Sequence, residues 1–318
     1  MLFLIILLII FIIFIVLLII AHRLFISSCS KNQKGYKLSN ENVNLINKEK
    51  EMYALFKPWY NSLEKMDEYI TSDDGYKLHA TYIKSSNSER LVICVPGYRA
   101  DVCEEFSGIL RYFIDNHTSV LLIDNRCTGS SEGEYITFGY MEANDLFKWI
   151  NYCINELNIN IPIYTYGVSM GATTVLLNTK YPLSDSVKGI IADAGYNNLK
   201  GELIYLCNKL FKVPGKLLVN LFNVYAKSIG KFDINDIDLN KVLIDNTKNI
   251  MFFHGNNDMV VDPENTRTNY AKCVKCNKEI QWFDGAGHAN SFYANSELYL
   301  NKLKYFFTSC ENNTFKGE

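Results

Sequence analysis

Residues 167–171 read Gly-Val-Ser-Met-Gly, and they lie where a short apolar run over residues 161–166 gives way to a helical pattern. A serine between two glycines at such a junction predicts a nucleophile elbow, a sharp turn that holds the serine hydroxyl clear of a sheet. This turn forces the serine into strained backbone angles, and it brings the chain so close that a Cβ at either glycine would clash. An ordinary tight turn between a strand and a helix fits the same five residues.

Apolar runs recur on both sides of this stretch. They cover residues 91–95, 120–123, 161–166, 187–192, 250–253 and 280–283. Continuous apolar runs are typical of parallel strands that are covered on both faces. Helical patterns separate them, and a hairpin around Asp74-Gly75 precedes them. The sequence therefore predicts an α/β fold with a mostly parallel, doubly wound sheet and an antiparallel start.

One long segment interrupts this alternation. Residues 196–243 contain no predicted strand, but they carry apolar helical patches over residues 203–211 and 217–225, which Val213-Pro214-Gly215 separates. An insertion of this size between strands is usually functional. We expect a small helical cap over the carboxyl ends of the strands, where open α/β sheets bind ligands.

The first residues form an added apolar segment. Leu2 to Ala21 contains no charged or strongly polar residue, and a run of about twenty such residues crosses a bilayer core. A cleaved signal peptide is the alternative, but no Lys or Arg precedes the run, which exceeds the usual apolar region of about 7–15 residues. We predict one transmembrane anchor over residues 1–22, a linker and lead-in helix over residues 23–66, and an α/β domain over residues 67–318.

Basic residues near the anchor predict its orientation. Arg23, Lys31, Lys34 and Lys37 follow the span over residues 2–21, and only the α-amine precedes it. Because Lys and Arg are in excess on the cytoplasmic side of membrane helices, we expect a single-pass protein with its main domain in the cytoplasm.

A competing pattern lies just after the anchor. Ile26-Ser27-Ser28-Cys29 resembles a bacterial lipoprotein processing site, whose cysteine would be lipidated. His22 and Arg23 separate it from the apolar run, and the basic leader of such proteins is missing. We therefore favour the uncleaved anchor.

Composition narrows the classes of partner. The net charge of −2 argues against a nucleic-acid partner. The nine cysteines are odd in number and scattered singly, which predicts no disulfide framework. Cys273 and Cys276 form the one close pair, and without a second pair we interpret them as the surface of a helix end rather than a redox or metal site. The oligomeric state is not indicated.

A serine hydroxyl is a poor nucleophile unless a base takes its proton, so the elbow requires a histidine and a group that orients it. His288 stands in the glycine-bracketed stretch Gly285-Ala-Gly-His-Ala-Asn, directly after the last predicted strand. Asp258 is the first carboxylate in the turn after residues 250–253. Ser169, Asp258 and His288 thus all follow strands, and they occur in the chain order of one known type of catalytic triad.

Other polar residues near strand ends are expected to be structural. The remaining histidines, which we interpret as ordinary loop or core residues, are His22, His79, His117 and His254. Asp193 is the alternative orienting acid, and Asp262 is expected to cap the next helix. Asp124 and Arg126 are expected in a buried salt bridge or turn. Arg99 is expected to be solvated, with contact to an anionic substrate as the alternative.

Acyl transfer also needs hydrogen-bond donors for the charge that develops on the carbonyl oxygen. The backbone N–H of Met170, the residue after the serine, is one candidate. The second is expected from the loop after residues 91–95, where Tyr98 is the natural donor.

Residues 67–308 resemble the extended bacterial α/β-hydrolase group of esterases, monoacylglycerol-lipase-like enzymes and serine-aminopeptidase-like proteins. The matching stretches are Pro96-Gly97-Tyr98, Asp124-Asn125-Arg126 with Gly129-Ser130-Ser131-Glu132-Gly133, residues 167–171, Ala192-Asp193-Ala194-Gly195-Tyr196, His254-Gly255 through Asp258, and Gly285-Ala286-Gly287-His288. The resemblance implies the α/β-hydrolase fold, with Ser169 as nucleophile, Asp258 as acid, His288 as base, and Tyr98 and Met170 as oxyanion donors. Such proteins usually carry His-Gly at Pro96-Gly97, and Cys127-Thr128 also departs from their pattern.

Together these observations predict a serine hydrolase that cleaves a carboxylic ester through an acyl-enzyme, without a metal or cofactor. The apolar cap and the anchor favour a small-molecule substrate with an aliphatic acyl chain, such as a lipid or monoglyceride. A serine peptidase or amidase would use the same triad. A catalytically silent hydrolase-fold protein that binds ligands at the membrane is a further alternative.

Overall fold

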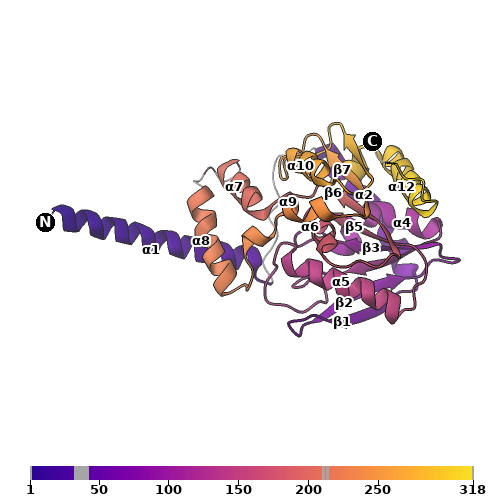
Figure 1. Cartoon of the computed structure of the whole chain (residues 1–318), viewed down its shortest axis with the longest axis horizontal. Coiled ribbons are helices and arrows are strands. Elements are labelled where there is room, and N and C mark those ends of the chain that lie inside the picture. Colours follow the sequence, from indigo (N-terminus) through magenta and orange to yellow (C-terminus); the bar gives the residue numbers. More distant parts are fainter. Residues whose placement is uncertain (1, 32–42, 210–211, 213–214, 317–318) are drawn as a thin grey trace.

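A single eight-stranded sheet forms the centre of the protein in the computed structural model, which describes residues 2–31, 43–209, 212 and 215–316 (Figure 1). Its strands follow the order β1-β2-β4-β3-β5-β6-β7-β8. The strands are β1 (Met66–Thr71), β2 (Lys77–Ile83), β3 (Arg90–Val95), β4 (Thr118–Ile123), β5 (Ile163–Val168), β6 (Val187–Asp193), β7 (Asn249–Gly255) and β8 (Lys278–Phe283). β1 pairs antiparallel with β2, and β2 pairs antiparallel with β4. All later neighbours are parallel, which confirms the predicted sheet.

Burial along the strands follows their place in the sheet. Every residue of β4 and β5 is buried, as the continuous apolar runs predict for central parallel strands. The edge strand β1 has no fully buried residue. Gly75 closes the β1–β2 hairpin with φ of +90°, a conformation that glycine adopts without a Cβ penalty.

Helices cover both faces of the sheet. One face packs against α2 (Val43–Ser62), α4 (Ser107–Asp115) and α12 (Ser296–Glu311). The other face packs against α5 (Tyr140–Asn155), α6 (Met170–Leu177) and α10 (Glu264–Lys272). Three shorter helices are α3 (Val102–Glu105), α9 (Leu239–Val242) and α11 (Ser291–Ala294). The sheet is therefore doubly wound, as expected.

The predicted cap is present as two helices, α7 (Leu199–Lys209) and α8 (Gly215–Ser228). They pack against each other and stand to one side of the sheet (Figure 1). Phe211, Val213 and Pro214, which the predicted pattern included, lie outside the described residues. Within the described part of this segment, the strand-like pairing is an isolated bridge between Asn198 and Asp238.

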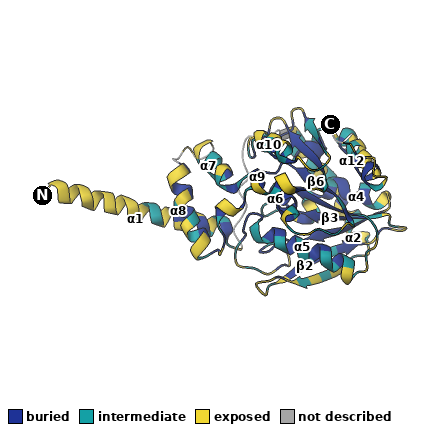
Figure 2. Cartoon of the chain, viewed as in Figure 1, coloured by how far each residue is buried: buried dark blue, intermediate teal, exposed yellow. Residues whose placement is uncertain are grey.

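The N-terminal helix α1 spans Leu2–Cys29, so it does not end near residue 22 as we expected. By length and composition it could cross a membrane. Its outer part is exposed along the whole circumference (Figure 2), whereas the side chains of Ala21, Phe25 and Cys29 are completely buried. These three residues are spaced four apart and form one face of the helix. The end of α1 is therefore part of the globular domain.

This buried end of α1 packs against the cap. The ring of Phe25 lies 5.7 Å from that of Phe222 on α8, and His22 lies 5.1 Å from Tyr225. The expected linker over residues 23–66 is thus partly helical at both ends, in α1 and in α2. Lys34 and Lys37 lie outside the described residues.

All nine cysteines lie in the described part of the chain, and none forms a disulfide. Cys29 is buried at the end of α1, and its lipidation stays an untested alternative. Cys273 ends α10 and is also buried, so our interpretation of Cys273 and Cys276 as helix-end surface is wrong for Cys273.

Candidate active site

The turn between β5 and α6 places Ser169 at the carboxyl end of the sheet. Ser169 has φ of 55° and ψ of −118°, a strained conformation for a residue with a side chain. A Cβ added to Gly167 would lie 2.1 Å from the Gly171 carbonyl oxygen, and one added to Gly171 would lie 2.0 Å from the Val95 carbonyl oxygen. Both glycines are therefore required by close approach of the backbone, as the sequence predicts.

Two loops bring His288 and Asp258 to this serine. His288 follows β8 and Asp258 follows β7. The Nε2 atom of His288 lies 2.8 Å from Ser169 Oγ, and its Nδ1 atom lies 2.7 Å from Asp258 Oδ2. The three predicted residues thus form one continuous chain of hydrogen bonds, although they lie far apart in sequence.

Asp258 is buried and fully hydrogen-bonded. Its Oδ1 accepts from the N–H groups of Val260 and Val261, and its Oδ2 also contacts Nε2 of His254 at 3.0 Å. Burial alone would raise the pKa of Asp258, but the adjacent His288 and the hydrogen bonds from both histidines outweigh it and hold the pKa below its ordinary value. The carboxylate is therefore ionised at neutral pH.

His254 is the first residue of this site that the sequence did not reveal. We interpreted it as an ordinary histidine at a strand end, but it is completely buried between Asp258 and the Thr266 hydroxyl, 2.6 Å from Nδ1. It contacts the same Asp258 oxygen, Oδ2, that His288 contacts, and so helps to fix the carboxylate. The available signal was its position four residues before Asp258, across one tight turn.

The alternative acid, Asp193, is not paired with His288. Its carboxylate oxygens accept hydrogen bonds from Ser291 Oγ at 2.9 Å and from Tyr299 Oη at 3.0 Å. Asp262 accepts from the Glu264 N–H at 3.0 Å, as expected for a residue that caps α10. Among the other histidines, His79 on β2 pairs with Asp124 through Nδ1 at 2.8 Å.

The loop after β3 lies directly against Ser169. A Cβ on Gly97 would lie 3.4 Å from Ser169 Cβ. The Pro96 carbonyl accepts from Asn125 Nδ2 at 2.9 Å, and the Gly97 N–H donates to Glu105 Oε2 at 2.7 Å. Asn125 and Glu105, neither of which we predicted, thus fix the loop that departs from the usual His-Gly pattern.

Glu105 belongs to α3, and its carboxyl group is turned toward this loop. Desolvation raises the pKa of Glu105 to about 8, although the Gly97 N–H and His288 act in the opposite direction. At neutral pH this carboxyl group is therefore mainly protonated and uncharged. An uncharged Glu105 does not repel negative charge that would develop on a substrate oxygen beside this loop.

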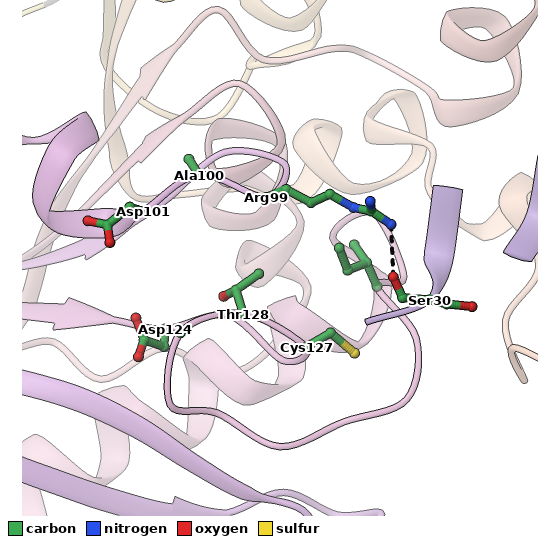
Figure 3. Close-up of a pocket in the computed structure, with 9 residues that line it drawn as sticks. Ser30, Arg99, Ala100, Asp101, Asp124, Cys127 and Thr128 are labelled. Atoms are coloured by element: carbon green, nitrogen blue, oxygen red, sulfur yellow. Dashed lines mark hydrogen bonds between the residues drawn. The ribbon is translucent and has the colours of Figure 1, made fainter. Parts of the chain in front are cut away.

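The end of α1 is fixed to the same loop. The Tyr98 hydroxyl donates to the Ser28 carbonyl at 2.7 Å, and the Arg99 guanidinium donates to the carbonyls of Ser27, Ser28 and Ser30 at 2.9–3.2 Å. Figure 3 shows the bond from Arg99 to Ser30. Arg99 therefore neutralises the negative end of the α1 helix. Our expectation of a solvated Arg99 is wrong, because these three backbone carbonyls engage its guanidinium. Contact with an anionic substrate stays a prediction.

A pocket of about 240 Å³ lies beside this loop, and Figure 3 draws the residues that line it. It is lined by residues that include Ser30, Arg99, Asp124 and Thr128, and by none of Ser169, Asp258 or His288. This pocket is therefore separate from the hydrogen-bonded chain at Ser169.

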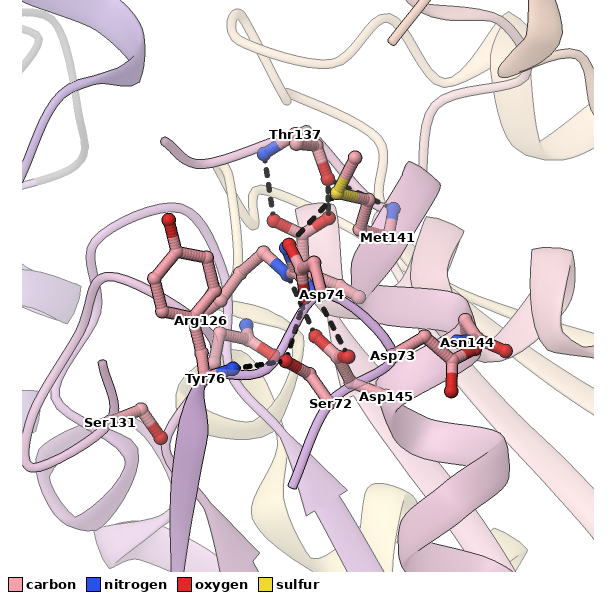
Figure 4. A network of polar contacts seen from close by, with 12 residues as sticks. Ser72, Asp73, Asp74, Tyr76, Arg126, Ser131, Thr137, Met141, Asn144 and Asp145 are labelled. Atoms are coloured by element: carbon pink, nitrogen blue, oxygen red, sulfur yellow. Dashed lines mark hydrogen bonds and ion pairs between the residues drawn. The ribbon is translucent and has the colours of Figure 1, made fainter. Parts of the chain in front are cut away.

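Arg126 forms the buried salt bridge that the sequence indicated. Its guanidinium makes two hydrogen bonds with Asp145 on α5, at 2.8 and 2.9 Å, and two with Asp74 in the β1–β2 turn, at 2.9 and 3.3 Å (Figure 4). It joins the hairpin, the loop after β4 and α5. Among the described residues, no group of three or more His, Cys, Asp or Glu side chains is arranged to hold a metal ion.

The strand order, the helices on both faces and the serine at the turn after β5 together define the α/β-hydrolase fold. Comparison with solved structures agrees. Esterase Pf2001 of Pyrococcus furiosus aligns with a TM-score of 0.65 and 21% identity, over 79% of this chain and 94% of that protein. Est1E of Butyrivibrio proteoclasticus, in a structure with ferulic acid bound, aligns with a TM-score of 0.61 and 17% identity, over 77% of this chain and 99% of that protein.

Sequence comparison also finds a similar protein. An uncharacterized protein of Bacillus subtilis (strain 168), YqkD, is 24% identical over 255 residues, which cover 80% of this chain and 83% of that protein. No family model matches the chain.

Proposed function

We propose that this protein is a membrane-anchored serine hydrolase that cleaves carboxylic esters through an acyl-enzyme. The observation that carries the proposal is the hydrogen-bonded chain from Ser169 Oγ through His288 to Asp258, at 2.8 and 2.7 Å. A hydroxyl in this arrangement has a base within reach, and the base has a fixed orientation.

In the proposed reaction, Ser169 Oγ bonds to the acyl carbonyl carbon while His288 Nε2 takes the hydroxyl proton. The ionised Asp258 stabilises the imidazolium. Collapse of the tetrahedral intermediate breaks the bond to the leaving alcohol, which receives the proton from His288. Water then attacks the acyl-enzyme by the same route, and Ser169 is restored with release of the carboxylic acid.

The oxyanion of each intermediate is proposed to bind the backbone N–H groups of Met170 and Tyr98. Met170 is the first residue of α6, so its N–H has no acceptor within the helix and lies at the positive end of the helix dipole. In the loop after β3, the Gly97 N–H is already engaged by Glu105, which leaves Tyr98 as the candidate donor.

Esters are the proposed substrates because esterases are among the proteins with the same fold, including Pf2001. The apolar helix α1 supports a membrane location, and Arg23 and Lys31, which follow its apolar span over residues 2–21, support a cytoplasmic domain. A lipid or monoglyceride is the substrate class that this location favours. The same triad would serve an amidase or peptidase, so the experiment includes amides.

A fluorophosphonate probe tests the nucleophile. We expect covalent labelling of the full chain in detergent, loss of labelling in Ser169→Ala, and unchanged labelling in Ser130→Ala, which alters an exposed serine elsewhere. Equal labelling of the wild type and Ser169→Ala would contradict the proposal. Rates on p-nitrophenyl esters of increasing chain length, measured beside aminoacyl anilides, then decide between esterase and peptidase.

Topology is tested by labelling single cysteines with a membrane-impermeant maleimide in intact cells. A cytoplasmic domain predicts that a cysteine introduced at the exposed Glu104 is labelled only after the membrane is permeabilised. Labelling in intact cells would overturn the proposed orientation.

A further inference from the structure

The cap helix α7 carries a buried carboxyl group that the fold itself does not use. Glu202 is 5% exposed, and neither of its carboxyl oxygens has a hydrogen-bond partner within the described part of the chain. Burial of an unpaired polar group is unfavourable, because the group loses its hydrogen bonds to water. An apolar side chain at this position would fold with less cost, so the position of Glu202 calls for a partner from outside the protein.

The carboxyl group lies within electrostatic range of the proposed active site. Its interaction partners are His288, Asp258 and Asp262, which lie in the segments that follow β8 and β7. The start of α7 is held there by Asn197, whose N–H donates to Asn265 and whose Nδ2 donates to Asn269, both on α10. These bonds of 2.9 and 2.8 Å fix the cap helix above the loop that carries Asp258.

The charge state of Glu202 limits what it can bind. Desolvation raises the pKa of Glu202 to about 8, with Asp258 and Asp262 acting in the same direction and His288 in the opposite one. At neutral pH the group is mainly a carboxylic acid, with one O–H donor and one free acceptor. A hydroxyl group, which also donates and accepts, is its natural complement.

We propose that Glu202 is a specificity residue that hydrogen-bonds a hydroxyl group close to the scissile carbonyl, so that the preferred substrates are esters of polyols. This inference rests on the proposed function of Ser169. A polyol monoester combines an apolar acyl chain with free hydroxyls. It therefore suits a site whose apolar cap contributes one uncharged acid.

The test compares three octanoate esters with the full chain in detergent, namely those of glycerol, n-propanol and 3-aminopropanol. For the wild type we expect kcat/KM on the glycerol ester to exceed that on the propyl ester by about ten-fold, the size that one well-formed hydrogen bond gives. Glu202→Leu is expected to remove this preference and leave the propyl ester rate within about two-fold. Glu202→Gln, which keeps a donor and an acceptor, is expected to retain the preference.

Glu264→Leu is the control, because it removes an exposed carboxylate on α10. A glycerol preference that persists in Glu202→Leu would overturn the proposal. The proposal would also be overturned if the wild type preferred the aminopropyl ester and Glu202→Gln abolished that preference. That result would show that Glu202 binds an ammonium group rather than a hydroxyl. If the wild type hydrolyses none of the esters, the result contradicts the proposed function of Ser169 rather than the role of Glu202 alone.

Thermal unfolding separates a folding defect from a change in specificity, and Glu202→Leu is expected to be at least as stable as the wild type.

Discussion

Ser169 occupies a backbone conformation that costs of order 1–3 kcal/mol for a residue with a side chain. The structure maintains it because two neighbouring segments approach too closely to allow any relaxation. The backbone at Gly171 contacts Val95 in β3, and the backbone at Gly167 contacts Gly171 in α6. The position of the hydroxyl is therefore set by backbone packing rather than by side-chain contacts.

Gly171→Ala is predicted to be strongly destabilising, by about 3 kcal/mol or more, because its Cβ would lie 2.0 Å from the Val95 carbonyl oxygen. The measurement is chemical or thermal unfolding of the purified protein. Gly287→Ala is the matched control, since the nearest atom to its added Cβ is 3.9 Å away. We expect the control to change stability by less than about 1 kcal/mol. Similar losses in both variants would rule out backbone contact as the cause.

The raised pKa of Glu105 predicts a pH dependence of stability. The pKa rises from its ordinary value of 4.5 to about 8, so the native state holds a proton that the unfolded state has lost between these values. The stabilisation is complete below about pH 4.5 and is lost as the pH rises toward 8, with a slope of at most about 1.4 kcal/mol per pH unit.

Unfolding of the wild type and Glu105→Gln between pH 5 and pH 8 checks this prediction. The glutamine keeps an acceptor for the Gly97 N–H but cannot ionise, so the fall in stability with rising pH should be shallower. Glu104→Gln, which changes the exposed neighbouring residue, should leave the slope as it is. A slope that Glu105→Gln does not alter would refute the assignment.

The functional residues that could be predicted from the sequence are those that lie in a recognisable local motif. Ser169, Asp258 and His288 each follow an apolar strand, and in each case the flanking residues indicate a turn. Glu105 and Glu202 have no such signal, because each lies within an ordinary helical stretch and gains its importance from burial against distant segments. The partners of Arg99 are likewise set by the path of α1, which the pattern around Arg99 does not indicate.

At the scale of elements, Arg126 joins three parts of the fold. It is 4% exposed and binds Asp145 on α5 and Asp74 in the β1–β2 turn. Arg126→Met is predicted to lower the free energy of unfolding by about 3–5 kcal/mol, because it leaves the buried Asp145 without its counter-charge. Arg111→Met, which removes an exposed i,i+4 pair on α4, should cost less than about 1 kcal/mol.

A second variant tests the physical reason. Adding Asp145→Leu to Arg126→Met removes the unpaired charge and should recover part of the lost stability. No recovery would indicate that packing of the arginine side chain matters more than its charge. The hairpin end is expected to loosen first, which hydrogen exchange in β1 and β2 would reveal.

The elements themselves were largely predictable. Each predicted apolar run corresponds to a strand, and the two apolar patches in residues 196–243 correspond to α7 and α8. The end of α1 was not predictable from hydropathy, because hydropathy falls at His22-Arg23 while the helix continues. The repeat of Ala21, Phe25 and Cys29 at intervals of four was the available signal, and it marks a face that packs on the cap and the loop after β3.

At the scale of the whole molecule, the contacts of α1 predict how the protein responds to truncation. Removing residues 2–18 leaves the buried face of Ala21, Phe25 and Cys29 in place, so the domain should unfold at a nearly unchanged temperature. Removing residues 2–30 uncovers the surface around Phe222 and Tyr98. This truncation should lower the free energy of unfolding by about 2 kcal/mol or more, because the burial of Phe25 alone is lost. Thermal unfolding and fluorophosphonate labelling of both truncations test this.

Two point variants provide the matched control in the full chain. Phe25→Ala is predicted to destabilise by about 3–5 kcal/mol, since its ring is completely buried. Phe14→Ala lies in the same helix but is 47% exposed, and it should not alter unfolding of the domain. Equal effects would show that the end of α1 contributes no packing.

A helix that continues into the domain differs from an anchor that is joined to the domain by a flexible linker. Each residue of a helix advances it by about 1.5 Å, so the residues between the apolar span and Phe25 set the height of Ser169 above the bilayer. Because the end of α1 is held by both α8 and the loop after β3, the domain cannot swing freely around its anchor. Inserting residues near His22 would raise the domain and also rotate it, by about 100° per residue. In a series of variants with one to several inserted residues, activity toward lipids in the bilayer would vary with the helical repeat.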